Sequence, residues 1–166
     1  MKKLFKILII AIICLSFIFI LIKCGNKGDA PFYGIEYASS YKKVESTMGK
    51  PDDVEDNGLQ NFNYYYENIS FLGQSGELRI HFELSKVDSM YYVYESFYEY
   101  DFEAYVEKVV SYYTKEHGDP ASTYNGSEKS MYYWELEDWD LSVETYLGRT
   151  STFVSTPNKL YIQLYH

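Results

Sequence analysis

Cysteine is almost absent from this sequence. Its two cysteines, Cys14 and Cys24, both lie before Gly28, so the rest of the 166-residue chain carries no thiol. That part can form neither a disulfide nor a thiolate metal site. Small extracellular domains are often held together by disulfides, so its stability must instead come from a packed core.

Basic residues are also scarce after the first segment. Five lysines precede Gly28, and from there onward 10 basic residues stand against 24 acidic ones, a net charge of −14. Binding to a phosphate backbone requires the opposite balance. We therefore expect no nucleic-acid partner.

Residues that signal catalysis are few. The three histidines, His81, His117 and His166, share no ligand-like spacing, and no glycine-rich phosphate loop or nucleophile elbow is present. We read His81, with Arg79, as solvated surface. The acidic run Glu135–Asp140 lacks the spacing of a calcium loop. The sequence thus predicts no enzyme, no metal and no cofactor.

One long apolar run is present, from Ile7 to Ile22. Counted from Leu4, it spans about 28 Å as a helix, close to the thickness of a hydrocarbon core. Residues 1–28 are therefore predicted to be either an uncleaved signal anchor or a lipoprotein leader that ends in lipidation of Cys24. Lys23 occupies the position where lipoprotein signals carry a small residue. Both interpretations place the folded part at the cell membrane, on the extracytoplasmic side.

Two stretches of the remaining chain have similar sequence patterns. Gly49-Lys-Pro51 and Gly118-Asp-Pro120 are 69 residues apart, and Tyr64 and Tyr66 precede Tyr132 and Trp134 by 68. Near-constant offsets indicate an internal duplication. We expect a first repeat at 29–100 and a second at 101–166.

Each repeat reads as a helix followed by three strands. The helices end at Gly-x-Pro, and segments such as 78–84 alternate between apolar and polar residues. The predicted fold class is α+β: two α-β-β-β repeats that form an antiparallel sheet with helices on one face, preceded by an N-terminal membrane helix.

A family resemblance is carried by Val44-x-x-x-Met48-Gly49-Lys50-Pro51-Asp52, which leads into an aromatic strand. This run resembles the SmpA/OmlA-type small lipoprotein domain, and the tandem is similar to the β-lactamase inhibitor protein fold. The resemblance covers residues 38–166 in outline and implies protein binding through an exposed sheet face and loops. The inhibitor family also has disulfides, which this chain lacks.

Aromatic residues are abundant, with 20 tyrosines, 10 phenylalanines and 2 tryptophans. Several strands carry aromatic rings on both of their faces. Helices on one side of the sheet can bury only the rings that point to that side. The other set either forms a recognition surface or stabilises the sheet as cross-strand pairs. The 148–158 loop either folds over the core or protrudes as an anchor. The candidate protein-binding residues are Tyr65, Tyr91, Tyr92, Tyr133 and Phe153.

We therefore expect a membrane-tethered extracytoplasmic module that binds a protein or peptide without catalysis. An envelope structural or assembly lipoprotein is the alternative. Weaker alternatives are an inhibitor of a secreted enzyme and a cell-wall hydrolase that uses acids such as Glu135 and Glu137.

Overall fold

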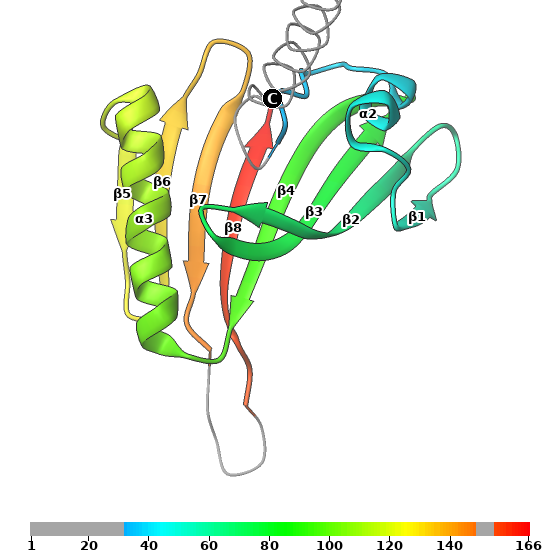
Figure 1. Cartoon of the computed structure of the whole chain (residues 1–166). Coiled ribbons are helices and arrows are strands. Elements are labelled where there is room, and N and C mark those ends of the chain that lie inside the picture. The colour runs from blue at the N-terminus through cyan, green and yellow to red at the C-terminus, as the bar shows by residue number, and fades with distance from the viewer. Residues whose placement is uncertain (1–31, 149–154) are drawn as a thin grey trace, which may run out of the picture.

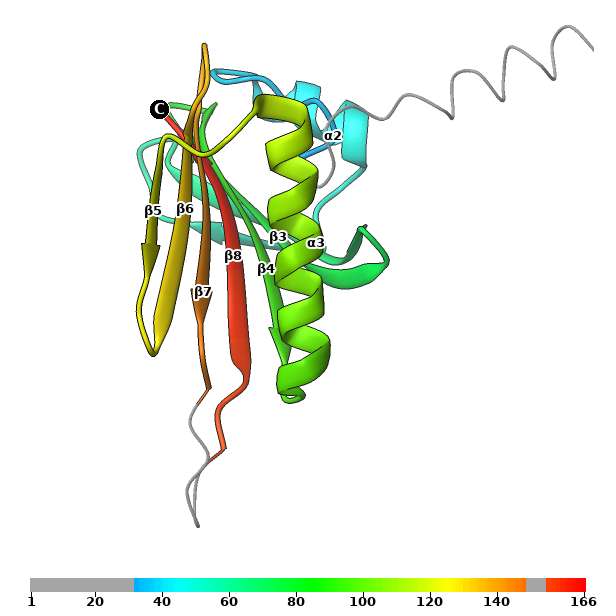
Figure 2. The ribbon, with the colours of Figure 1, turned by 90° about the vertical axis from the view of Figure 1, so that its left-hand side faces the viewer.

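A computed structural model describes residues 32–148 and 155–166, in which both helices lie on the same side of one antiparallel sheet (Figures 1 and 2). The strands follow the order β1-β2-β3-β4-β8-β7-β6-β5. The elements are α2 (Tyr41–Met48), β1 (Asp53–Asp56), β2 (Phe62–Phe71), β3 (Gln74–Glu83), β4 (Lys86–Ser96), α3 (Glu99–His117), β5 (Ser122–Asn125), β6 (Lys129–Glu135), β7 (Asp140–Tyr146) and β8 (Asn158–Tyr165).

The predicted fold class was wrong. Four strands, not three, follow each helix, and the resulting eight-stranded sheet dominates the described residues. The additional strands are β1, with the sequence DVED, and β5, with the sequence STYN; every residue in both is exposed. They join the sheet through backbone pairing with β2 and β6, so no apolar alternation marks them in the sequence.

The predicted membrane helix and signal anchor gain no support. Neither helix of the described part of the chain is long and apolar enough to cross a membrane. The apolar run from Ile7 to Ile22 and the possible lipidation site Cys24 lie outside the described residues.

The two helices end in the same way. Gly49 and Gly118 follow the last turns with φ of 91° and 84°, a region that glycine adopts without strain. The carbonyl of each glycine accepts a hydrogen bond from a buried ring of the second strand that follows: Tyr66 Oη donates to Gly49 at 3.2 Å and Trp134 Nε1 to Gly118 at 2.9 Å. The same contact therefore occurs twice, 68 to 69 residues apart.

The two groups of strands meet in the middle of the sheet. Tyr92 of β4 pairs with Ile162 of β8, which lies 70 residues later in the chain. β4 is the fourth strand after α2, and β8 is the fourth strand after α3. Because these two equivalent strands pair antiparallel, an approximate two-fold axis passes between Tyr92 and Ile162.

The core lies between the sheet and α3. Phe102, Tyr105, Val109 and Tyr113 form one buried stripe along this helix. Tyr92, predicted to belong to a protein-binding face, is instead fully buried on the helix side, with 0% exposure. Strand alternation places its ring toward α3, where the Tyr105 hydroxyl lies 3.5 Å from its own.

The β2–β3 hairpin curls across the helix side of the sheet toward α3 (Figures 1 and 2). The β2–β3 pairing shifts register between Tyr66 and Ile69, and such bulges bend a strand. At the tip, the carbonyl of Phe71 accepts a hydrogen bond of 3.0 Å from the Tyr105 hydroxyl, and that of Leu72 accepts one of 2.6 Å from Lys108 Nζ. The helix face of the sheet is therefore covered by α2, α3 and this tip.

Candidate functional site

The open face is the side of the sheet opposite α2 and α3. Within the described ranges, no helix covers it (Figure 2). Each strand contributes every second residue to this face, and the register joins them into a row that crosses all eight strands. From β1 to β5, the row contains Asp53, Tyr65, Arg79, Tyr91, Gln163, Ser142, Tyr133 and Ser122.

A hollow of about 240 Å³ lies on the open face over β2, β3, β4 and β8. Arg79 occupies its centre, because the register places this residue directly between Tyr65 and Tyr91. The hollow is lined by Asn63, Tyr65, Arg79, His81, Tyr91, Val93 and Tyr161. Three tyrosine rings and one arginine thus converge on a space the size of a side chain.

A chain of hydrogen bonds fixes one wall of the hollow. The Tyr65 hydroxyl and Asn63 Nδ2 both donate to Glu55 Oε2, at 2.7 and 2.8 Å. Since the amide nitrogen of Asn63 faces Glu55, its oxygen accepts from His81 Nδ1 at 2.7 Å. In the neutral imidazole, this assigns the proton to Nδ1 and leaves Nε2 as an acceptor.

The hydrogen bonds at Glu55 shift two pKa values in opposite directions. Donation by Tyr65, with a smaller contribution from Asn63, lowers the pKa of the Glu55 carboxyl. The same bond, with some burial, raises the pKa of the Tyr65 phenol. Both shifts favour the state in which a neutral phenol donates to a charged carboxylate.

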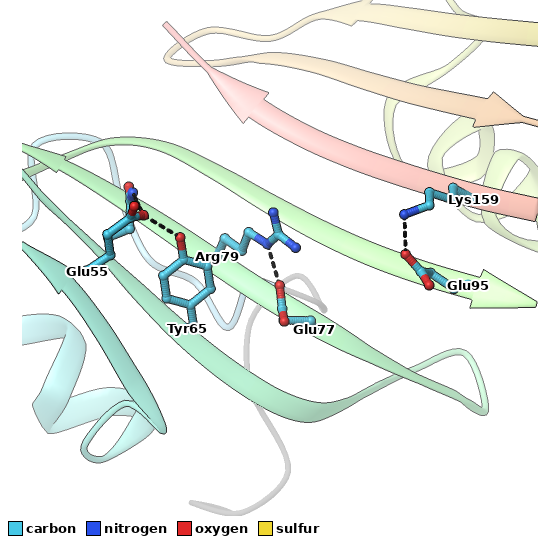
Figure 3. A network of polar contacts seen from close by, with 7 residues as sticks. Glu55, Tyr65, Glu77, Arg79, Glu95 and Lys159 are labelled. Atoms are coloured by element: carbon cyan, nitrogen blue, oxygen red, sulfur yellow. Dashed lines mark hydrogen bonds and ion pairs between the residues drawn. The ribbon is translucent and has the colours of Figure 1, made fainter. Parts of the chain in front are cut away.

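Two contacts restrict the Arg79 side chain. Its Nε donates to Glu77, and its guanidinium lies 5.6 Å from the centre of the Tyr65 ring (Figure 3). The side chain is 48% exposed. Cation–π contact and the ion pair together restrict a side chain that would otherwise sample many rotamers.

Two further ion pairs flank the hollow on the open face. Lys159 of β8 pairs with Glu95 of β4 at 2.5 Å (Figure 3), and Lys129 of β6 pairs with Glu144 of β7 at 2.7 Å. Lys129 also lies 4.9 Å from the centre of the Tyr146 ring. These three cations, Arg79 included, are each matched by a carboxylate, so the face carries no excess of positive charge.

The predicted binding residues are distributed unevenly. Tyr65 and Tyr91 line the hollow. Tyr133 lies in the same row on β6 but outside the hollow, and its hydrogen bond to Asp140 raises the pKa of its phenol to about 12. Tyr92 lies on the buried side, and Phe153 lies outside the described residues.

Sequence reasoning missed Asn63, Arg79 and His81 as site residues, and read the last two as solvated surface. The alternation with Leu78 and Ile80 places Arg79 and His81 on the open face. What the sequence does not contain is the register that sets Arg79 between two tyrosines of neighbouring strands.

Two other kinds of site considered in the sequence, a metal centre and a pair of catalytic acids, are not assembled in the part of the chain that the structure describes. Within residues 32–148 and 155–166, no cluster of three or more histidine, cysteine or acidic side chains is arranged to hold a metal. Glu135 and Glu137 are both exposed, and neither lines the hollow.

The comparisons with known proteins yield no relative. No protein-family model, no curated protein and no solved structure matches the chain. The resemblance to the small lipoprotein domain and to the inhibitor fold stays a prediction.

Proposed function

We propose that this chain is a binding module that recognises a protein or peptide partner through the open face, without a catalytic step of its own. The observation that carries the proposal is the hollow around Arg79, walled by tyrosines on a sheet face that no described helix covers. Tyrosines and arginine are the residues that most often dominate binding energy at interfaces.

Cross-strand pairing alone accounts less well for this arrangement. Tyrosines that only stabilise a sheet gain by packing against each other, at roughly 0.2–1 kcal/mol for each pair. Here Tyr65 and Tyr91 are separated by Arg79 and leave an open space above it. Rigid rings around an open space favour recognition, because few rotamers are lost when a partner fills it.

Site-specific photo-crosslinking tests the proposal. A benzophenone amino acid is introduced at position 65 or 91 of the full-length chain, in the cells that produce it. We expect one discrete protein adduct, identified by mass spectrometry. The matched control is the same amino acid at Tyr100, which is 83% exposed in the first turn of α3. Equal adducts from position 100, or none from 65 and 91, would refute the proposal.

A further inference from the structure

The guanidinium of Arg79 presents unused donors to the hollow. Arginine carries five N–H donors. Among the described residues, Arg79 donates a hydrogen bond to Glu77, and this bond uses Nε. In Figure 3 the dashed line to Glu77 starts at Nε, and neither terminal nitrogen of Arg79 carries one. Four N–H groups in the planar geometry that suits a pair of oxygens are therefore available.

The surroundings limit what an oxyanion ligand can be. The hollow of about 240 Å³ equals the liquid volume of roughly eight waters, enough for one side chain or chain end. Glu77 and Glu55 both lie near Arg79. Because Coulomb repulsion grows with the charge of the ligand, these carboxylates disfavour a phosphate dianion more than a singly charged carboxylate.

We propose that the hollow binds a carboxylate of the partner, held by the terminal nitrogens of Arg79 between the rings of Tyr65, Tyr91 and Tyr161. This inference rests on the proposed function and names the chemistry of the anchoring group. Glu77 fixes the guanidinium from the Nε side, and the Glu55–Asn63–His81 chain holds the adjacent wall. The ligand therefore meets an arginine that is already oriented, which reduces the entropy lost on binding.

Three dipeptide probes test the proposal on the full-length chain. Acetyl-tyrosyl-glutamate amide offers a side-chain carboxylate, acetyl-tyrosyl-glutamine a terminal carboxylate, and acetyl-tyrosyl-glutamine amide neither. NMR titrations follow the Arg79 Nε–H signal. We expect one charged probe to bind at least about tenfold more tightly than the neutral one, because hydrogen bonds to charged groups are the stronger class. The better charged probe identifies the source of the carboxylate.

Substitutions separate the site from general charge effects. We expect Arg79→Gln to remove the preference for the charged probe, and Arg79→Lys to retain only part of it, since an ammonium lacks the planar fork. Lys86→Gln removes the same charge from an exposed position at the start of β4 and should leave the preference within about twofold. Thermal unfolding of each variant confirms that it is folded.

Each outcome decides between the two proposals. Equal binding of all three probes, tighter binding of inorganic phosphate, or a preference that survives Arg79→Gln overturns the carboxylate site. If crosslinking from positions 65 and 91 persists in that case, the binding module stands and only its anchoring chemistry is wrong. If the crosslinks are also absent, both proposals fail.

Discussion

Replacing Gly76 with alanine tests how closely β3 and β4 pack. A Cβ on Gly76 would lie 2.4 Å from the carbonyl oxygen of Val93 and 2.6 Å from Cζ of Tyr92. Ordinary contacts begin near 3.4 Å, so the overlap amounts to 1.0 Å. The carbonyl belongs to the sheet backbone and the Tyr92 ring is fully buried, so neither group moves freely.

The expected cost follows from two opposing effects. Overpacking a filled core costs about 1–3 kcal/mol, and an immobile backbone contact belongs at the upper end of that range. Alanine also restricts the unfolded chain, which offsets about 0.4–1 kcal/mol. We expect Gly76→Ala to lower the free energy of unfolding by about 2 kcal/mol and the melting temperature by roughly 5–8 °C.

Urea unfolding followed by tryptophan fluorescence measures this change. Ser75→Ala, at the exposed neighbouring position of β3, is the control and should stay within about 0.5 kcal/mol of the parent chain. If Gly76→Ala is no less stable than Ser75→Ala, the close approach of β3 and β4 described above is incorrect.

Three further predictions concern other parts of the molecule. Trp134→Phe removes the hydrogen bond to the end of α3 and should cost about 1–3 kcal/mol in thermal unfolding; an unchanged stability would contradict the contact. Tyr105→Phe should speed amide hydrogen exchange at the β2–β3 hairpin tip more than elsewhere, because the tip loses its 3.0 Å bond to α3; uniform exchange would count against this. The hydrogen bond from Tyr65 lowers the pKa of Glu55 on folding. This bond therefore stabilises the fold fully above the pKa of an unfolded glutamate, near 4.3, and its contribution disappears as the pH falls through the pKa of Glu55 in the folded chain. Glu55→Gln should therefore flatten the loss of stability between about pH 5 and 3, and an identical acid unfolding profile would argue against that bond.

Parts of this architecture were accessible from the sequence. Both glycine helix ends follow from the sequence spacing, and the apolar side of β3 follows from its alternation. β1 and β5 were not accessible, because four exposed residues that pair through their backbone leave no hydrophobic pattern. The turn between β2 and β3 uses Leu72 with φ of 49°, and leucine gives no signal for that conformation.

The candidate site was accessible only in part. Alternation within each strand predicts which face of that strand carries Tyr65 or Arg79. The hollow, however, depends on which residues of β2, β3, β4 and β8 lie opposite one another. Tyr92 illustrates the limit, since rings on both faces of β4 make its inward and outward sides look alike in sequence. The strand register determines which of these rings face the core. That register depends on tertiary contacts that act together, so the sequence of one strand does not contain it.

The place of β8 in the sheet has a consequence for biogenesis. This strand is the last of the described elements along the chain, yet it lies between β4 and β7, at the centre of the sheet. Without residues 158–165, β4 and β7 would each have one unpaired edge at the middle of the sheet. The sheet can therefore close only when this segment pairs, and until then both edges can pair with other chains, which is a route to aggregation.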